Sequence, residues 1–513
     1  MSLALVYSRN AELQATEVLI EIHLANGLPA MNMVGLAETA VKESKDRVRG
    51  AIVNSRFDFP IRRITINLAP ADLPKEGSRF DLAIAIGILL ASKQIQTDST
   101  QLLLSNIEFY GELALSGDLR PIKGILSAAI KARENNKILI VPKKNASEAA
   151  LIKGLTVYYA DHLLDVCAFL NGKKDLPQAE ISPASKQVSK HCFSEIKGQQ
   201  QAKRAFEIAA AGNHSLLLSG PPGSGKTMLA SRMATILPPM TDEQAQESAA
   251  IRSISGEHLN IDNWGIRSFR SPHHTASGVA LVGGGSNPKP GEISLAHHGV
   301  LFLDELPEFN RHVLEVLREP LESGTINISR AIRQVEYPAR FQLIAAMNPC
   351  PCGYFGDEKK HCHCSMEQRQ RYQSKISGPF LDRIDLYVEL QALSHYELCQ
   401  PAEKDNKTNL ESSVEIQKRV CIAREKQLQR RNKNNALLSG KEIEKDCQLD
   451  QAGLKLLEQA MDKLNLSARA YHRILRVART IADLDNKHTS SQHIAMHHLS
   501  ESIRYRKIDR NRP

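Results

Sequence analysis

The sequence predicts an α/β protein: a P-loop αβα core, preceded by a separate α+β domain and followed by a helical region. Three observations predict this class. An apolar run at residues 216–218 stops at a glycine-rich turn, and a helical pattern begins after it. A second apolar run at residues 299–303 ends in two adjacent carboxylates. Before both runs, the residues up to 175 alternate between strand and helix patterns.

The first domain is predicted to span residues 1–175. Its first strand lies within residues 10–24, where Val18, Ile20, Ile22 and Leu24 alternate with polar residues. Helices are expected over 38–54, 81–90 and 123–134, and strands over 64–68, 111–115 and 137–142. Residues 176–190 have no clear period and are predicted to be a linker. The P-loop core is then expected over 191–395 and a C-terminal helical domain over 396–513.

The turn at residues 220–227 has the pattern G-x-x-x-x-G-K-T, the Walker A or P-loop motif. Its glycines allow backbone angles and a close approach that a Cβ would block. Consecutive N–H groups and the following helix N-terminus then face a polyphosphate. Lys226 would place a positive charge on the β- and γ-phosphates, and the Thr227 hydroxyl would ligate Mg²⁺. The alternative is a Gly/Pro turn beside an unrelated lysine, which the strand before and the helix after disfavour.

The apolar run at 299–303 has the Walker B pattern, because Asp304 and Glu305 follow it directly. Asp304 would hold Mg²⁺ through water, and Glu305 would orient and polarise the attacking water. The alternative is a buried strand with a polar end. The P-loop upstream favours the first interpretation, which makes the protein an Mg²⁺-dependent nucleoside triphosphatase.

Several further phrases resemble the AAA+ ATPases. Gly198 and Gln199 lie in I-K-G-Q, and AAA+ proteins carry a similar phrase beside the adenine. Asn348 follows the apolar run 341–347 and resembles the sensor-one residue, which helps to position the water. For Gly198 and Gln199 the alternative is a helix cap. The expected nucleotide contacts are Gly198, Gln199, Gly220, Pro221, Pro222, Gly223, Ser224, Gly225, Lys226, Thr227 and Met228.

Two arginines complete the resemblance. Arg383 lies in G-P-F-L-D-R-I-D, which resembles the arginine-finger segment. Such an arginine comes from a neighbouring subunit and neutralises charge on the γ-phosphate. Arg469 opens a helix with apolar residues at helical spacing and resembles the sensor-two arginine of a helical lid. Ordinary surface salt bridges are the alternative for both. The expected catalytic residues are Lys226, Asp304, Glu305, Asn348, Arg383 and Arg469.

Two inserts distinguish the chain from a minimal AAA+ module. Residues 268–298 contain an apolar tip and a triple glycine, and they resemble a helix-2 insert loop. Residues 324–340 alternate on both sides of a short turn, which predicts a β-hairpin just before the sensor strand. MCM helicases and magnesium chelatase motors share these inserts, and in the helicases both loops line a central pore. Arg330 and Arg333 would contact DNA phosphates there; a solvated hairpin with ordinary surface arginines is the alternative.

Four of the nine cysteines crowd into the pattern C-x-C-x₉-C-x-C directly after Asn348. Four thiolates at short spacing in a loop can enclose a tetrahedral Zn²⁺ of structural type. His361 and His363 offer alternative ligands, and four reduced thiols in a polar loop are the other interpretation. The candidate zinc ligands are Cys350, Cys352, Cys362 and Cys364.

The first domain resembles the proteolytic domain of Lon-type proteases, which has a ribosomal S5-type α+β fold. The resemblance lies in residues 111–124, in residues 138–143 and in the helix opening at 75–81. Those proteases use a Ser–Lys dyad, but Arg79 and Leu126 stand at the two positions here. Neither side chain can perform that chemistry, so the domain is predicted to be proteolytically inactive. Ser78, next to Arg79, is the one hydroxyl that leaves proteolytic activity as an alternative.

The composition and the charge of the chain predict where the protein is located and what kind of partner it binds. No apolar run reaches the roughly 18 residues that a membrane span requires. The N-terminus lacks the basic flank and the long apolar core of a signal peptide. The formal net charge is +9, and most of the excess follows residue 175. We therefore expect a cytoplasmic protein without a membrane partner, whose nucleotide-binding half can contact a polyanion.

The whole chain resembles the ComM/YifB family of magnesium-chelatase-like AAA+ ATPases. The phrases F-R-S-P-H-H-T at 269–275, P-G-E-I-S-L-A-H at 290–297 and N-P-C-P-C-G at 348–353 carry this resemblance. It implies an ATP- and Mg²⁺-dependent hexameric DNA helicase. Such a branch-migration motor extends the integration of transforming single-stranded DNA by homologous recombination. The implied partners are single-stranded and branched DNA, further copies of the chain and recombination proteins. The alternatives are a chelatase-type remodeller of a protein partner and an ATP-dependent protease.

Overall fold

The computed structural model describes residues 2–36, 41, 43–75, 77–96, 103–180, 191–257, 261–285, 288–329, 334–357, 360–392, 411–464, 466–485 and 493–506. The chain folds into two compact units. Unit 1 contains Met1–Gln187 and Asp242–Trp264, and unit 2 contains Val188–Thr241 and Gly265–Pro513. From residue 181 onward, the predicted linker lies outside the described residues. No helix of the described part is both long and apolar enough to span a membrane.

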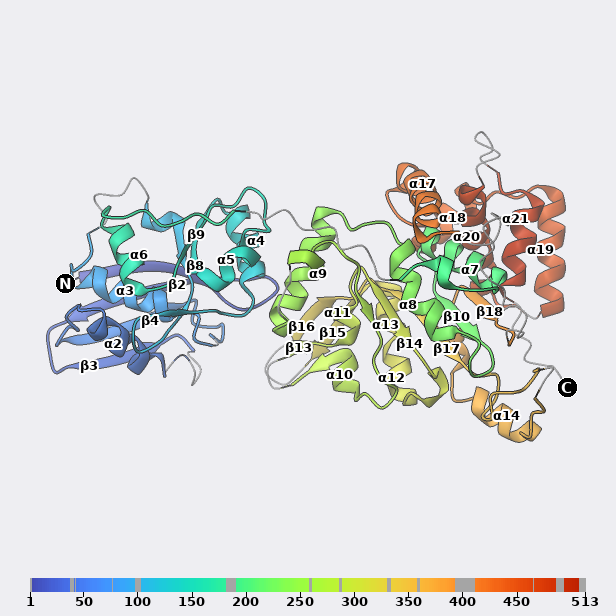
Figure 1. Cartoon of the computed structure of the whole chain (residues 1–513), viewed down its shortest axis with the longest axis horizontal. Coiled ribbons are helices and arrows are strands. Elements are labelled where there is room, and N and C mark those ends of the chain that lie inside the picture. The colour runs from blue at the N-terminus through green and yellow to red at the C-terminus, as the bar shows by residue number, and fades with distance from the viewer. Residues whose placement is uncertain are drawn as a thin grey trace. The chain divides into compact units, whose positions relative to one another are not determined.

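Unit 1 is organised by a seven-stranded sheet in the order β3-β4-β2-β1-β5-β8-β9 (Figure 1). β2 pairs antiparallel with β1 and β4, whereas β5, β8 and β9 continue the sheet in parallel. Every second residue of β2 is buried, because one face of the sheet packs against α3. The strands are β1 (Ser2–Arg9), β2 (Glu17–Ala25), β3 (Ala30–Val34), β4 (Arg63–Ala69), β5 (Ile107–Phe109), β8 (Ile138–Pro142) and β9 (Val157–Ala160), with a small pair β6 (Glu112–Leu113) and β7 (Leu119–Arg120).

The predicted class of unit 1 is confirmed, but some element bounds differ. Residues 10–16 are not part of a strand: the Asn10 amide donates to the Thr16 carbonyl at 3.0 Å, which closes a loop between β1 and β2. The strand β1 itself went unpredicted. Ten of the eleven residues of α3 are buried, as its apolar sequence suggests. The helices are α2 (Ser44–Asn54), α3 (Asp81–Ala91), α4 (Ile125–Glu134), α5 (Lys143–Ala149) and α6 (Leu163–Leu170).

Helix α9 (Asp242–Ser255) follows the P-loop helix in the chain, yet it packs within unit 1. It lies against α4, and Ala249 joins the apolar cluster that also contains Trp264. Asp242 pairs with Lys153 at 2.7 Å, and the Ser253 hydroxyl donates to Glu148 at 2.5 Å. Unit 1 therefore includes a segment of chain inserted between two elements of unit 2.

Unit 2 is built on a parallel five-stranded sheet in the order β11-β14-β17-β10-β18. All residues of β10, β14 and β17 are buried, which explains why these strands are continuous apolar runs and do not alternate. The strands are β10 (Leu216–Ser219), β11 (Phe269–Arg270), β14 (Val300–Leu303), β17 (Gln342–Met347) and β18 (Leu386–Glu389). The αβα core is confirmed.

Two hairpins and a set of helices surround the sheet of unit 2. In Figure 1 the helices α17 to α21, orange to red, gather beside α7, which contacts α17 and α20. The hairpins are β12 (Gly283–Gly284) with β13 (Lys289–Pro290), and β15 (Thr325–Ser329) with β16 (Gln334–Pro338). The helices are α7 (Gln200–Gly212), α8 (Lys226–Ile236), α10 (Gly278–Val282), α11 (Glu292–Leu295), α12 (Arg311–Val316), α13 (Arg318–Ser323), α14 (Met366–Gln373), α15 (Gly378–Leu381), α17 (Ser413–Arg431), α18 (Gly440–Asp446), α19 (Gln451–Leu464), α20 (Ala468–Leu484) and α21 (Met496–Arg504).

Candidate active site

Three strands of the parallel sheet bring the predicted catalytic residues together. β10 leads into the P-loop, β14 ends before Asp304 and Glu305, and β17 ends before Asn348. β17 pairs with both of the other strands, so the three carboxyl ends meet at one edge of the sheet. Ligands of open parallel α/β sheets bind at this edge. Residues separated by more than a hundred positions therefore share one site.

The P-loop has the geometry of a phosphate-binding turn. Gly223 and Gly225 have φ values of +80° and +87°, and α8 begins immediately afterwards at Lys226. The Ser224 hydroxyl is buried and has no hydrogen-bond partner among the described residues. A buried polar atom without a partner fits a ligand that supplies one. The turn thus suits a polyphosphate at the N-terminus of α8.

Lys226 lies across the P-loop. Its ammonium donates to the carbonyls of Gly220 and Pro221 at 2.8 and 3.0 Å and to Asn348 Oδ1 at 3.1 Å. Burial lowers the pKa of Lys226, while the charges of Asp304 and Glu305 act in the opposite direction. Phosphate oxygens would offer this ammonium stronger, charged acceptors than the neutral oxygens it binds here. The contact also links the P-loop to the sensor asparagine.

Thr227 and Asp304 form a pair of oxygen ligands. The Thr227 hydroxyl donates to Asp304 Oδ2 at 2.7 Å, and the Glu305 amide donates to Asp304 Oδ1 at 2.9 Å. A hydroxyl and a carboxylate are the hard oxygen donors that Mg²⁺ takes beside substrate phosphates. The residues present therefore fit an Mg²⁺ ion bound with the nucleotide.

Glu305 lies beside a histidine that sequence reasoning did not single out. The His274 Nδ1 atom is 3.1 Å from Glu305 Oε2. The His274 ring lies against the His273 ring in a tilted arrangement with 4.1 Å between centroids, and it makes a T-shaped contact with the Phe309 ring. The contact places a ring nitrogen of His274 beside the carboxylate that is predicted to orient the attacking water. Only the phrase S-P-H-H-T could have suggested it, since no spacing rule joins His274 to Glu305.

Gly198 and Gln199 lie where α7 begins. Both have left-handed backbone angles, with φ values of +60° and +52°, and Gln199 Nε2 donates to the Gln391 carbonyl at 2.9 Å. Gln391 follows β18, the strand beside the P-loop strand. The phrase is therefore held near one edge of the parallel sheet, and the contact of these two residues with adenine stays a prediction.

The predicted finger arginine, Arg383, and the predicted sensor-two arginine, Arg469, have different surroundings. Arg383 is 7% exposed; its Nη2 pairs with Glu322 at 2.7 Å and its Nη1 donates to the Pro379 carbonyl at 2.8 Å. Burial lowers the pKa of Arg383, and the charge of Glu322 opposes this shift. Arg469 is exposed in the first turn of α20. The described structure thus holds Arg383 in an ion pair within its own chain, and its role as a finger stays a prediction.

Behind Arg383 lies a buried polar network that sequence reasoning missed. Asp385 accepts hydrogen bonds from the Ser215 amide and hydroxyl at 3.0 and 3.1 Å, and it pairs with Arg473 of α20. His214 lies 3.5 Å from Asp385 and 2.7 Å from the Thr480 hydroxyl. Burial alone would raise the pKa of Asp385, but Arg473, His214 and Ser215 hold it well below its usual range. The network joins the segment that contains Arg383 to the start of β10 and to α20.

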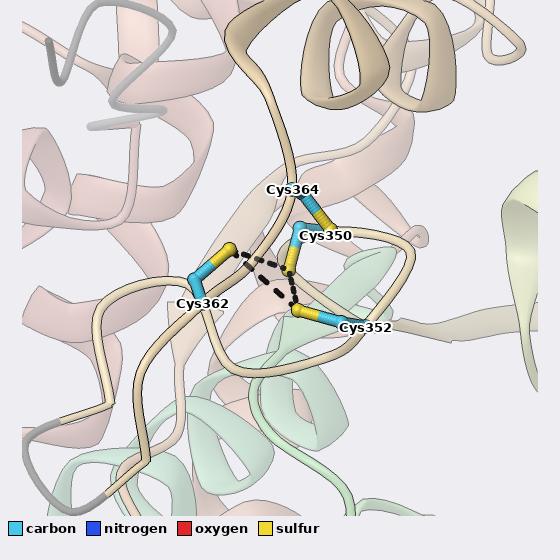
Figure 2. A group of neighbouring side chains, drawn as sticks. All are labelled: Cys350, Cys352, Cys362 and Cys364. Atoms are coloured by element: carbon cyan, nitrogen blue, oxygen red, sulfur yellow. Dashed lines mark hydrogen bonds between the residues drawn. The ribbon is translucent and has the colours of Figure 1, made fainter.

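The four predicted cysteines converge, as Figure 2 shows. The Sγ atom of Cys350 lies 3.3 Å from that of Cys352 and 3.6 Å from that of Cys362, and Cys352 and Cys362 are 3.6 Å apart. Cys364 completes the group, in which all four sulfur atoms lie within 4.8 Å of one another. His361 and His363 are not members of it. Thiolates at this spacing fit a metal of the zinc type.

The predicted DNA-contacting residues Arg330 and Arg333 lie outside the described residues. The strands β15 and β16 that flank them form the predicted hairpin. The other insert contains α10, the β12–β13 pair and α11, and Val279 on α10 is exposed. Both inserts therefore exist as predicted within the described residues, whereas their contact with DNA stays a prediction.

In unit 1, the residues at the positions of the Lon Ser–Lys dyad, Arg79 and Leu126, make structural contacts. Arg79 is buried and donates to the carbonyls of Arg9 (3.0 Å) and Lys123. Leu126 is fully buried in an apolar cluster, and the Ser78 hydroxyl donates to Glu112. The guanidinium thus fixes local backbone where the proteases carry their nucleophile. The predicted loss of proteolysis agrees with this arrangement but stays a prediction.

Comparisons with known proteins agree with the site and the fold. The family described as "Magnesium chelatase, subunit ChlI" matches residues 192–398. "Subunit ChlI of Mg-chelatase" matches residues 20–145, and "Magnesium chelatase, subunit ChlI C-terminal" matches residues 410–506. Together these matches extend over both units and most of the chain.

Individual relatives are similar over nearly the whole length. The "Competence protein ComM" of Haemophilus influenzae is 51% identical, covering 99% of this chain and 98% of the relative. The protein YifB of Salmonella typhimurium is 50% identical over the same shares. Lon protease 2 of Bacillus subtilis is 27% identical over 33% of this chain and 35% of its own. With its P-loop, Walker B carboxylates and two inserts, the chain belongs to the ComM/YifB family of magnesium-chelatase-like AAA+ ATPases.

Proposed function

We propose that the protein is an ATP-driven DNA motor, a helicase and branch-migration enzyme that promotes integration of transforming single-stranded DNA by homologous recombination. The observation that carries the proposal is a complete P-loop and Walker B site in a core with two inserts. The similarity to a protein named for competence supports the biological setting. The positive charge of the nucleotide-binding half suits a polyanionic substrate.

The residues of the site divide the work of hydrolysis. Glu305 would orient the attacking water and take its proton once its carboxylate leaves the 3.1 Å contact with His274, because it directly follows Asp304 at the strand end. Lys226 holds the β- and γ-phosphates, and Asn348, which binds Lys226, faces the same position. Thr227 and Asp304 would hold Mg²⁺, which neutralises charge on the phosphates. Zn²⁺ in the four-cysteine group would be a separate, structural ion.

The ring assembly belongs to the same proposal. Arg383 would act on the nucleotide of a neighbouring subunit, and Arg469 would act as the sensor-two arginine of the helical lid. The chain would then work as a ring, in our proposal a hexamer. For this, Arg383 must leave Glu322, its partner within the chain. The exposed Glu322 carboxylate binds the arginine only weakly, so a γ-phosphate can displace it. The loops of the two inserts would then meet DNA in the centre of the ring.

The test measures ATP hydrolysis of the full chain with no DNA, single-stranded DNA, duplex and forked DNA, and strand displacement on the fork. We expect DNA to stimulate hydrolysis and the fork to be unwound. Glu305→Gln should bind ATP and assemble, yet neither hydrolyse nor unwind. Arg330→Ala/Arg333→Ala should lose DNA stimulation and keep basal hydrolysis. An ATPase that ignores every DNA would contradict the proposal.

A second candidate is a chelatase-type remodeller of a protein partner, which the match to the magnesium chelatase subunit favours. Its nucleotide site would be the same, because the core elements are shared. A stable ATP-dependent complex with a metal-insertion subunit, together with DNA-independent hydrolysis, would favour this function over the first. A protease would instead cleave unfolded protein in a manner sensitive to Ser78→Ala.

A further inference from the structure

The four-cysteine group lies directly against the nucleotide-binding loop. Gly353, which follows Cys352, has φ +84°, and a Cβ added to it would lie 2.6 Å from Pro222 Cδ. The backbone of the cysteine loop is therefore in contact with the P-loop at Pro222. No side chain larger than hydrogen fits this contact unless the two loops separate.

The same loop carries the sensor asparagine on its other side. Asn348 precedes Cys350 by two residues, and its Oδ1 accepts the hydrogen bond from Lys226 at 3.1 Å. Beyond Cys364, helix α14 brings the Tyr372 hydroxyl back close to the backbone of Asn348. Burial raises the pKa of Tyr372 to about 12, so the hydroxyl stays neutral. The cysteine loop thus supports Asn348 and Pro222 together.

The cysteine loop is irregular, with local turns and side-chain contacts such as that of Arg369 over the Phe355 ring. Residues 353–365 contain no helix or strand among those described, and Cys352, Cys362 and Cys364 are all partly exposed. The sulfur separations of 3.3–3.6 Å are too long for a disulfide, whose S–S bond is about 2.0 Å. They approach the edge of about 3.8 Å of a tetrahedron with Zn–S bonds of about 2.3 Å. Four converging thiols without a metal would offer only weak hydrogen bonds.

We propose that Zn²⁺ bound by Cys350, Cys352, Cys362 and Cys364 fixes the loop that supports Asn348 and the P-loop, so that metal loading sets the affinity for ATP. The inference rests on the proposed ATPase function only in requiring that ATP binds at the P-loop. With the metal bound, Gly353 stays in contact with Pro222, and Asn348 keeps its hydrogen bond with Lys226. Without it, both contacts loosen while the sheet beneath them remains.

The experiment uses the full chain purified without added metal, with zinc content measured by mass spectrometry and ATP binding measured with a fluorescent ATP analogue. We expect about one zinc per chain. A zinc-selective chelator, used with Mg²⁺ kept in excess throughout, should release it and weaken ATP binding by about tenfold, a loss of about 1.4 kcal/mol in binding free energy. Adding Zn²⁺ alone should restore the affinity. An unchanged circular dichroism spectrum of the metal-free chain would show that it stayed folded.

Variants separate the metal site from its effect on the P-loop. Cys362→Ser/Cys364→Ser should lose zinc and reproduce the weak ATP binding, with circular dichroism unchanged. Cys421→Ser is the matched control, since Cys421 is a partly exposed cysteine on α17 outside the group. This variant should keep its zinc and its affinity for ATP. Absence of zinc from the purified chain and no zinc uptake would overturn the metal site. Zinc-free protein that binds ATP as the loaded protein does would overturn the coupling. Neither readout involves DNA, so failure of the proposed motor function would be recognised separately.

Discussion

Replacing Asp385, two residues after Arg383, should destabilise unit 2. The carboxylate accepts two hydrogen bonds from Ser215 and pairs with Arg473 and His214 in a fully buried position. Asp385→Ala leaves the Arg473 guanidinium, which is 15% exposed, without its ion-pair partner. Breaking a buried pair in this way costs about 3–5 kcal/mol. Asp385→Asn keeps one acceptor for Ser215 and loses the charge, so we expect a smaller loss.

Urea unfolding can assign this loss to one unit. The chain has a single tryptophan, Trp264, which packs in unit 1, so its fluorescence reports that unit while circular dichroism reports both. Asp385→Ala should shift the circular dichroism transition and leave the fluorescence transition in place. Asp382→Asn, three residues upstream, is the control. A loss below about 1 kcal/mol, or an equal shift of both transitions, would refute the reasoning.

The pH dependence gives an independent check on the same carboxylate. Its folded pKa lies well below the ordinary value of about 3.9, so the stabilisation is fully present above that value. It is lost as the pH falls below about 4 toward the folded pKa, because the unfolded chain then takes up the proton. The difference between the wild type and Asp385→Asn should be constant from pH 8 to about 5 and shrink below about 4. A difference that grows on acidification would show the opposite sign of shift.

Three further predictions concern the active site. Glu305→Gln should lower ATP turnover by about 10²–10⁴-fold with ATP binding retained, and unchanged turnover would remove Glu305 as the base. His274→Ala, with His273→Ala as control, should raise DNA-free hydrolysis roughly 3- to 10-fold, because it frees the Glu305 carboxylate from the 3.1 Å contact; a fall would indicate a supporting role. Arg383→Ala should lower hydrolysis by about 10³-fold, and mixing it with Lys226→Ala should restore part of the turnover if finger and P-loop come from different subunits. No recovery on mixing would place Arg383 outside the shared site.

The amino-acid sequence by itself determined the local parts of this protein. The Walker A and Walker B phrases, the sensor asparagine and the cysteine spacing each lie within a short segment, where residue type and spacing define the chemistry. The strands of the core could equally be predicted from the sequence, since fully buried parallel strands are continuous apolar runs. The confirmed αβα core and the inserts follow from such patterns.

The tertiary structure decided which distant segments meet. Three examples join residues that no sequence pattern links. They are the contact of His274 with Glu305, the network around Asp385 and the contact of Gly353 with Pro222. The placement of α9 in unit 1 is of the same kind, because no local pattern indicates that its buried face packs against α4. Sequence patterns state what a segment can bury or bind. Which partner it finds depends on packing over the whole chain, and only the folded structure shows it.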